Sequence, residues 1–190
     1  MRRVWAAAGV GLMIALPGWV GGADVGNPQA AVWKEQRLTF YYVGRTARYS
    51  CQGLRDKVRS LLLDLGARRD IKVSVLACDE SASRLTGGSL GPNLGLVFSS
   101  PALRDAAAKP SGPGDLSSLA ANYIPFTLAN DVFRNIGLGD CELIQEFTRQ
   151  ILPKMATRDV KQDIACVPNQ MSGSRFFVRG EILKATDSSP

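Results

Sequence analysis

The amino-acid sequence predicts an α+β fold, a two-layer α/β sandwich with two helices on one face of a mixed or antiparallel sheet. The first observation is a cysteine-bounded unit that occurs twice, from Cys51 to Cys78 and from Cys141 to Cys166. The second is that each unit begins with a helical apolar pattern and ends with a strand-like one. Internal similarity of this kind is typical of a duplicated unit, here β-α-β-β.

The first repeat is expected over residues 32–105. Its helix begins after Ser50, a residue type that caps helix N-termini, and ends at Gly66. Strand-like stretches surround this helix at residues 37–43, 71–78 and 94–99. Cys78 is out of phase with the apolar residues of its strand, so a β-bulge is expected there. The apolar face of the helix is formed by Leu54, Val58, Leu61, Leu62 and Leu65.

The second repeat is expected over residues 119–186. Asp140 is the predicted N-cap of its helix, and Pro153 ends that helix early. Strands are predicted at residues 123–128, 160–166 and 175–183. The helix presents an apolar face of Ile144, Phe147, Ile151 and Leu152.

A Gly/Pro/Ser-rich linker over residues 106–118 is expected to join the repeats, and residues 187–190 form a frayed tail. The linker is long enough for the two halves to share one sheet and one core. The partner surface is then the bare sheet face or the seam between the halves. The alternative is two independent lobes that move on the linker.

The N-terminal residues 1–23 have the layout of a signal peptide. Arg2 and Arg3 precede 13 uncharged apolar residues, Pro17 breaks the run, and Ala23 offers a cleavage site. An uncleaved anchor is the alternative. The protein is therefore expected in the periplasm or secreted, with a flexible segment at 24–31. No later apolar stretch reaches spanning length, so no integral membrane segment is expected after cleavage.

An oxidising compartment favours disulfides, and four cysteines allow three pairings. In each unit the helix rises roughly 20 Å and the strand returns about as far. Each cysteine at a helix start therefore meets the cysteine at the end of the following strand. This predicts Cys51–Cys78 and Cys141–Cys166. Two reactive thiols at helix N-termini, Cys51 and Cys141, are the alternative.

The chain contains no histidine. This excludes nucleophile–histidine pairs and imidazole metal sites, so no metal, cofactor or catalytic residue is predicted. The Gly-x-Ser-x-Gly pattern at residues 87–91 lacks the histidine that a nucleophile elbow requires. Asp140 and Glu142 are interpreted as first-turn residues that complement the helix dipole. Without Arg2 and Arg3, 21 basic groups face 17 acidic ones, which does not indicate nucleic-acid binding.

Basic and aromatic residues gather before and within the first helix. Such a mixture can hold an anionic glycan or another polyanion. It is also what an ordinary strand-to-helix corner contains. The candidate anion or partner surface consists of Arg45, Arg48, Tyr49, Arg55 and Arg59.

These features favour a non-enzymatic, exported, disulfide-stabilised domain with a binding role, whose partner is an envelope protein or an anionic glycan. The alternative is an envelope enzyme that uses carboxylates only, such as a glycan-acting hydrolase. The paired motifs, residues 49–57, 139–143 and 166–168, resemble small uncharacterised exported proteins of Gram-negative bacteria. That resemblance implies a fold but no activity.

Overall fold

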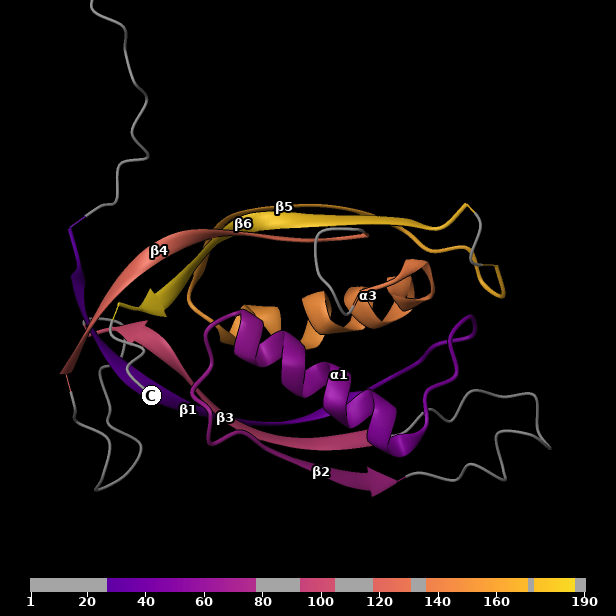
Figure 1. Cartoon of the computed structure of the whole chain (residues 1–190), viewed down its shortest axis with the longest axis horizontal. Helices are drawn as coiled ribbons and strands as arrows, with labels where there is room; N and C mark the ends of the chain where they lie inside the picture. Colours follow the sequence, from indigo (N-terminus) through magenta and orange to yellow (C-terminus); the bar gives the residue numbers. More distant parts are fainter. Residues whose placement is uncertain (1–26, 78–92, 105–117, 131–135, 171–172, 187–190) are drawn as a thin grey trace, which may run out of the picture.

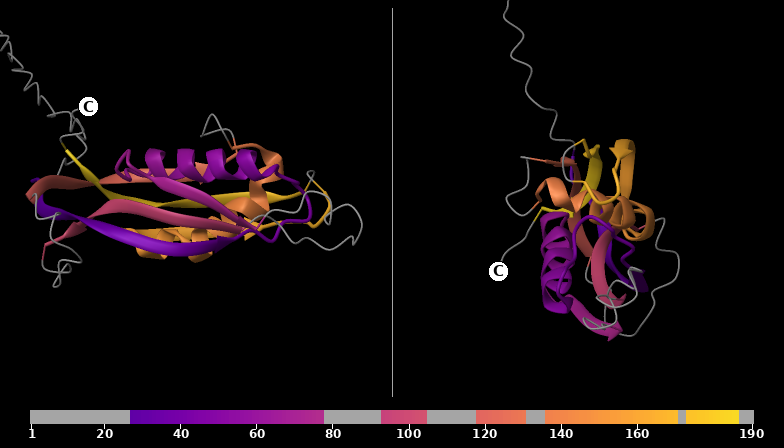
Figure 2. Two further views of the ribbon diagram at one scale, coloured as in Figure 1. Left: turned by 90° about the horizontal axis from the view of Figure 1, so that it is seen from below. Right: turned by 90° about the vertical axis from the view of Figure 1, so that its right-hand side faces the viewer.

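The computed structural model describes residues 27–77, 93–104, 118–130, 136–170 and 173–186. Within them, six strands form one antiparallel sheet in the order β2-β3-β1-β4-β6-β5. The strands are β1 (Gln29–Tyr41), β2 (Lys72–Ala77), β3 (Asn93–Leu103), β4 (Ser118–Ala129), β5 (Thr157–Ala165) and β6 (Arg175–Ala185). The helices are α1 (Cys51–Asp64) and α3 (Cys141–Gln150), with 3-10 turns η1 (Leu138–Asp140) and η2 (Leu152–Lys154). Figure 2 shows that the strands and α1 run along the long dimension of the molecule.

The predicted fold class is wrong, because the described part of the chain is mainly β. About 49% of it lies in strands and 24% in helices, within a single antiparallel sheet. This replaces the two-layer α/β sandwich of duplicated units. The strands are longer than predicted: β1 already begins at Gln29, within the segment 24–31 that was expected to be flexible. The full length of β1 was not predicted because the polar residues from Lys34 to Arg37 interrupt the apolar–polar alternation that is typical of a strand.

Each cysteine-bounded unit contains an Arg-Asp-aliphatic-Lys motif, at residues 69–72 and 158–161, and the two copies have different structures. Arg69 and Asp70 form a turn and Lys72 begins β2, whereas residues 158–161 lie inside β5. In β5 the pairing with β6 shifts register between Arg158 and Lys161, and Asp159 has a φ of 54°. Such a bulge bends and twists an edge strand, which protects it from unwanted pairing.

The sheet curves around the helices and encloses the core. β1 pairs with β4 only from Gln29 to Val32, and beyond this point the two strands diverge (Figure 1). The helices α1 and α3 lie between the two halves of the sheet (Figure 1). Phenylalanines from both halves, such as Phe40 and Phe176, belong to the same buried cluster as Phe147 of α3.

Local signals set the ends of α1 as predicted. Ser50 Oγ accepts a hydrogen bond from the backbone N–H of Gly53, and Gly66 adopts a φ of 89° after the helix. The predicted apolar face of α1 is buried. α3 ends at Gln150, and Pro153 lies in the 3-10 turn that follows.

Several predictions concern residues outside the described part of the chain: the signal peptide 1–23, Cys78, the tail 187–190 and, except for Ser118, the linker 106–118. The β-bulge expected in the strand before Cys78 has a counterpart at a register shift between Val75 and Ala77. Among the described residues, no helix combines the length and apolar character that crossing a membrane requires.

Candidate functional site

Two carboxylates at the start of α3 are buried, which the sequence did not indicate. Asp140 is 4% exposed and Glu142 is 7% exposed. Asp140 ends η1, and its Oδ2 accepts a hydrogen bond of 2.7 Å from the backbone N–H of Gly137. The Lys57 ammonium of α1 contacts the same oxygen, and the Tyr49 hydroxyl donates to Oδ1. Asp140 therefore joins α3 to α1 rather than only complementing a helix dipole.

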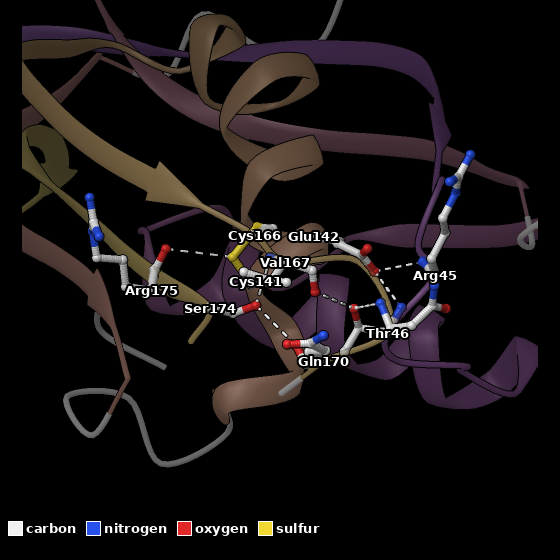
Figure 3. Close-up of a disulfide and its surroundings, with 10 residues drawn as sticks. Arg45, Thr46, Cys141, Glu142, Cys166, Val167, Gln170, Ser174 and Arg175 are labelled. Atoms are coloured by element: carbon white, nitrogen blue, oxygen red, sulfur yellow. Dashed lines mark hydrogen bonds between the residues drawn. A yellow bond between two sulfur atoms is a disulfide. The ribbon is translucent and has the colours of Figure 1, made fainter. Parts of the chain in front are cut away.

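Glu142 holds the loop of residues 42–50 that connects β1 to α1. Its Oε2 accepts hydrogen bonds from the backbone N–H groups of Arg45, at 2.6 Å, and Thr46, at 2.8 Å (Figure 3). Two N–H groups on one charged oxygen form strong, directional bonds. The loop also folds tightly over Tyr42: a Cβ atom at Gly44 would lie 1.8 Å from the Tyr42 hydroxyl oxygen, so this position requires glycine.

Two tyrosines complete this cluster, which we call the acidic clamp: Tyr42, Tyr49, Lys57, Asp140 and Glu142. The Tyr42 and Tyr49 rings meet edge to face at 5.1 Å. Tyr42 donates its hydroxyl to the Ala47 carbonyl at 2.7 Å. Burial raises the pKa of Tyr49 strongly, and the hydrogen bond to Asp140 and that residue's charge add to the effect. Burial also raises the pKa of Tyr42, with the charge of Glu142 as the next cause.

These shifts predict a loss of stability in alkali. A group whose pKa is higher in the folded state stabilises the fold fully below its ordinary pKa, near 10 for tyrosine. That contribution is lost as the pH rises above about 10 towards the folded-state pKa. We therefore expect the free energy of unfolding, measured by urea titration, to fall progressively as the pH rises above about 10. Tyr49→Phe should flatten this dependence, and an unchanged slope in that variant would contradict the assignment.

A disulfide lies beside the clamp. Cys141 and Cys166 are bonded, with 5.6 Å between their Cα atoms, which confirms one of the two predicted bridges. Cys51 is also disulfide-bonded. After Cys166, the Val167 carbonyl accepts from the Thr46 hydroxyl at 3.3 Å, and Ser174 Oγ accepts from the Val167 N–H at 2.9 Å (Figure 3). The bridge thus holds the β5–β6 connection at the start of α3, and Thr46 joins the same connection to the loop that Glu142 holds.

The residues of the candidate anion or partner surface have several different roles in the structure. Arg45 offers its backbone to Glu142, and the Tyr49 hydroxyl is engaged by Asp140. Arg55 pairs with the neighbouring Asp56 at 3.0 Å, and Arg59 donates to the Arg69 carbonyl at 3.4 Å. Arg48 is exposed in the loop.

The chemistry of the clamp is that of a structural junction. The groups that donate to the Asp140 and Glu142 carboxylates belong to the chain itself. These hydrogen bonds hold α1, α3 and the loop together. Among the described residues, no group of three histidine, cysteine or acidic side chains is arranged to hold a metal ion. The clamp could not be found in the sequence, because its partners are separated by 83 to 97 residues.

A second feature is an open edge of β1, residues Trp33 to Thr39, on the side that faces β4. Backbone groups of successive strand residues point to opposite neighbours. The Ala30 carbonyl accepts from the Arg104 N–H beyond β3, so even-numbered residues of β1 face β3. The backbone groups of odd-numbered residues face away from β3. Pro101 of β3 agrees with this: it has no N–H to donate, and its partner in β1 is the odd-numbered Trp33. Beyond Val32, none of the described residues forms a strand on this side of β1.

A side chain closes the far end of the open edge. The Gln150 carboxamide accepts from the Tyr41 N–H at 2.9 Å and donates to the Tyr41 carbonyl at 2.7 Å. A neighbouring strand would make the same pair of bonds. The open edge is thus bounded by β4 at one end and by Gln150 at the other.

No family model, no curated protein and no solved structure matches this chain. The functional argument therefore rests on the geometry of the described residues.

Proposed function

We propose that the protein is an exported, disulfide-stabilised binding domain that holds an extended polypeptide segment along the open edge of β1. The observation that carries the proposal is the row of backbone groups from Trp33 to Thr39, bounded by β4 and Gln150. An extended peptide that adds to a strand edge gains main-chain hydrogen bonds, and its side chains supply the specificity.

The edge of β1 suits this role better than the facing edge of β4. The Ala120 carbonyl of β4 accepts from the Thr186 N–H that follows β6, so odd-numbered residues of β4 point towards β1. One of them is Pro125, which cannot donate a hydrogen bond. The charges of Lys34, Glu35 and Arg37 on β1 discourage unspecific strand pairing. They favour a peptide whose own charges are complementary to these three side chains.

Amide hydrogen exchange tests the geometry directly. In the protein alone, the amides of Glu35, Arg37 and Thr39 should exchange orders of magnitude faster than those of Gln36 and Leu38, which face β3. Linear peptides selected from a displayed library should slow exchange at these odd-numbered positions. Selected peptides that protect other amides, or uniform protection along β1 without peptide, would contradict the proposal.

A matched pair of proline variants separates binding from folding. Arg37→Pro removes an N–H from the open edge, whereas Gln36→Pro removes one from the ladder with β3. We expect Arg37→Pro to fold and to lose the selected peptides, and Gln36→Pro to be much less stable. If Arg37→Pro folds and still binds them with unchanged affinity, the peptide does not use this edge.

A further inference from the structure

The outer face of β5 and β6 carries two cations that oppose each other. Lys161 and Arg179 are direct partners in the β5–β6 register. Both are exposed, and the neighbouring Val178 is buried in the core, so Arg179 projects from the opposite, outer face. Directly opposed strand residues project on the same face with Cβ atoms about 5 Å apart, and like charges there are destabilising.

The cations around this pair are neutralised, but the pair itself is not. Arg158 contacts Glu181, and Arg175 pairs with Asp163 at 3.2 Å. Among the described residues, no carboxylate forms an ion pair with Lys161 or Arg179. Arg179 instead lies over the Phe177 ring, with 5.4 Å between the guanidinium carbon and the ring centroid. The like-charge pair therefore has no carboxylate in direct contact, because Glu181 and Asp163, which flank it on this face, contact Arg158 and Arg175.

The arrangement of the surrounding charges is linear. Arg179 and Arg175 alternate with Phe177 along β6, and Arg158 and Lys161 lie beside them on β5. Four residues of a strand span roughly 13 Å, so the cations form a row along the strand direction. The adjacent outer positions of β4, Tyr123, Pro125 and Thr127, are uncharged. Glu181 and Asp163 lie in the same row, but their ion pairs with Arg158 and Arg175 are exposed or partly exposed and contribute little. A linear polyanion can therefore engage these two arginines as well as Lys161 and Arg179.

We propose that this row binds a linear anionic glycan, with one sulfate, phosphate or carboxylate group held between Lys161 and Arg179. An oxyanion there would accept from both cations at once and remove their repulsion. Phe177, held under Arg179, keeps the guanidinium in place on the surface. This site lies on a different part of the sheet from the open edge, so it does not depend on peptide binding.

Heparin, a linear sulfated glycan, is a suitable probe of the full-length oxidised protein. The double variant K161Q/R179Q should bind heparin roughly fivefold or more weakly than the wild type, as expected for two exposed ion pairs. The control R69Q/K72Q removes the same charge from the start of β2, at the other end of the sheet, and should stay within about twofold of the wild type. If both double variants lost heparin affinity equally, net charge alone would explain the effect and the proposal would be overturned. Unchanged heparin binding in K161Q/R179Q would also overturn it.

A second variant distinguishes the site from a structural defect. Lys161→Glu places an opposite charge beside Arg179, so it should raise the melting temperature by about 2–4 °C while it weakens heparin binding. A variant that is more stable and also binds heparin as tightly as the wild type would overturn the proposal. Retention on phosphatidylglycerol vesicles but not on heparin would assign the row to a membrane surface instead.

Discussion

Replacing Cys141 and Cys166 together by alanine is expected to lower the free energy of unfolding by about 3–4 kcal/mol. The bridge closes a loop with a sequence separation of 25 residues, and the chain-entropy relation gives this magnitude for such a loop. Without the bridge, the unfolded chain gains freedom, and the β5–β6 connection loses its covalent link to the start of α3. Urea unfolding of oxidised wild type and variant measures the difference.

The single variants Cys141→Ala and Cys166→Ala serve as controls, because each opens the same bridge. Each should lose most of what the double variant loses. Cys141 is 2% exposed and Cys166 is half-buried, so an effect of lost packing alone would be larger at Cys141 than at Cys166. A loss confined to Cys141→Ala would show that side-chain packing, rather than the cross-link, supplies the stability.

Removing the carboxylate of Asp140 is the second large effect. Asp140→Ala should cost about 3–5 kcal/mol, because it leaves the Lys57 ammonium, the Tyr49 hydroxyl and the Gly137 N–H without their common acceptor. The value should fall at the lower end of that range, since the Lys57 side chain is 31% exposed and water can solvate part of it. Asp140→Asn should recover part of the loss, because an amide oxygen can still accept a hydrogen bond.

Asp163→Ala is the matched control for Asp140→Ala. Asp163 forms an ion pair with Arg175 in which both side chains are more than 60% exposed. Its removal should cost about 0–1 kcal/mol, since exposed ion pairs contribute little. Combining Asp140→Ala with Lys57→Met should cost less than the sum of the two single changes, because both changes remove the same contact between Lys57 and Asp140. Similar losses in Asp140→Ala and Asp163→Ala would show that the acidic clamp does not stabilise the fold.

The helices were predictable because their signals are local. The cap at Ser50, the turn at Gly66 and the apolar face of α1 all act within a few residues, and the structure places them as predicted. The same locality explains the confirmed Cys141–Cys166 bridge: one helix rise and one strand return bring the chain back to its starting point. The strand lengths were not predictable, because the polar stretch from Lys34 to Arg37 is held in β1 by its partners in β3.

The candidate sites depended on tertiary structure more strongly. The sequence predicted a partner surface on a bare sheet face or at the seam between halves. It could not identify the open edge of β1, which exists because the pairing of β1 with β4 ends at Val32. It assigned Asp140 and Glu142 to the helix dipole, since nothing near them in the chain indicates Tyr49, Lys57 or the loop N–H groups as partners.

The sequence by itself therefore determined where the two helices form and which cysteine pairs with Cys141. Tertiary structure alone decided the fold class, the burial of the acidic clamp and the opposition of Lys161 and Arg179. The physical reason is distance along the chain. Caps, periodicity and short loops report the preferences of neighbouring residues, whereas sheet register and burial arise only when segments far apart in sequence compete for the same partners.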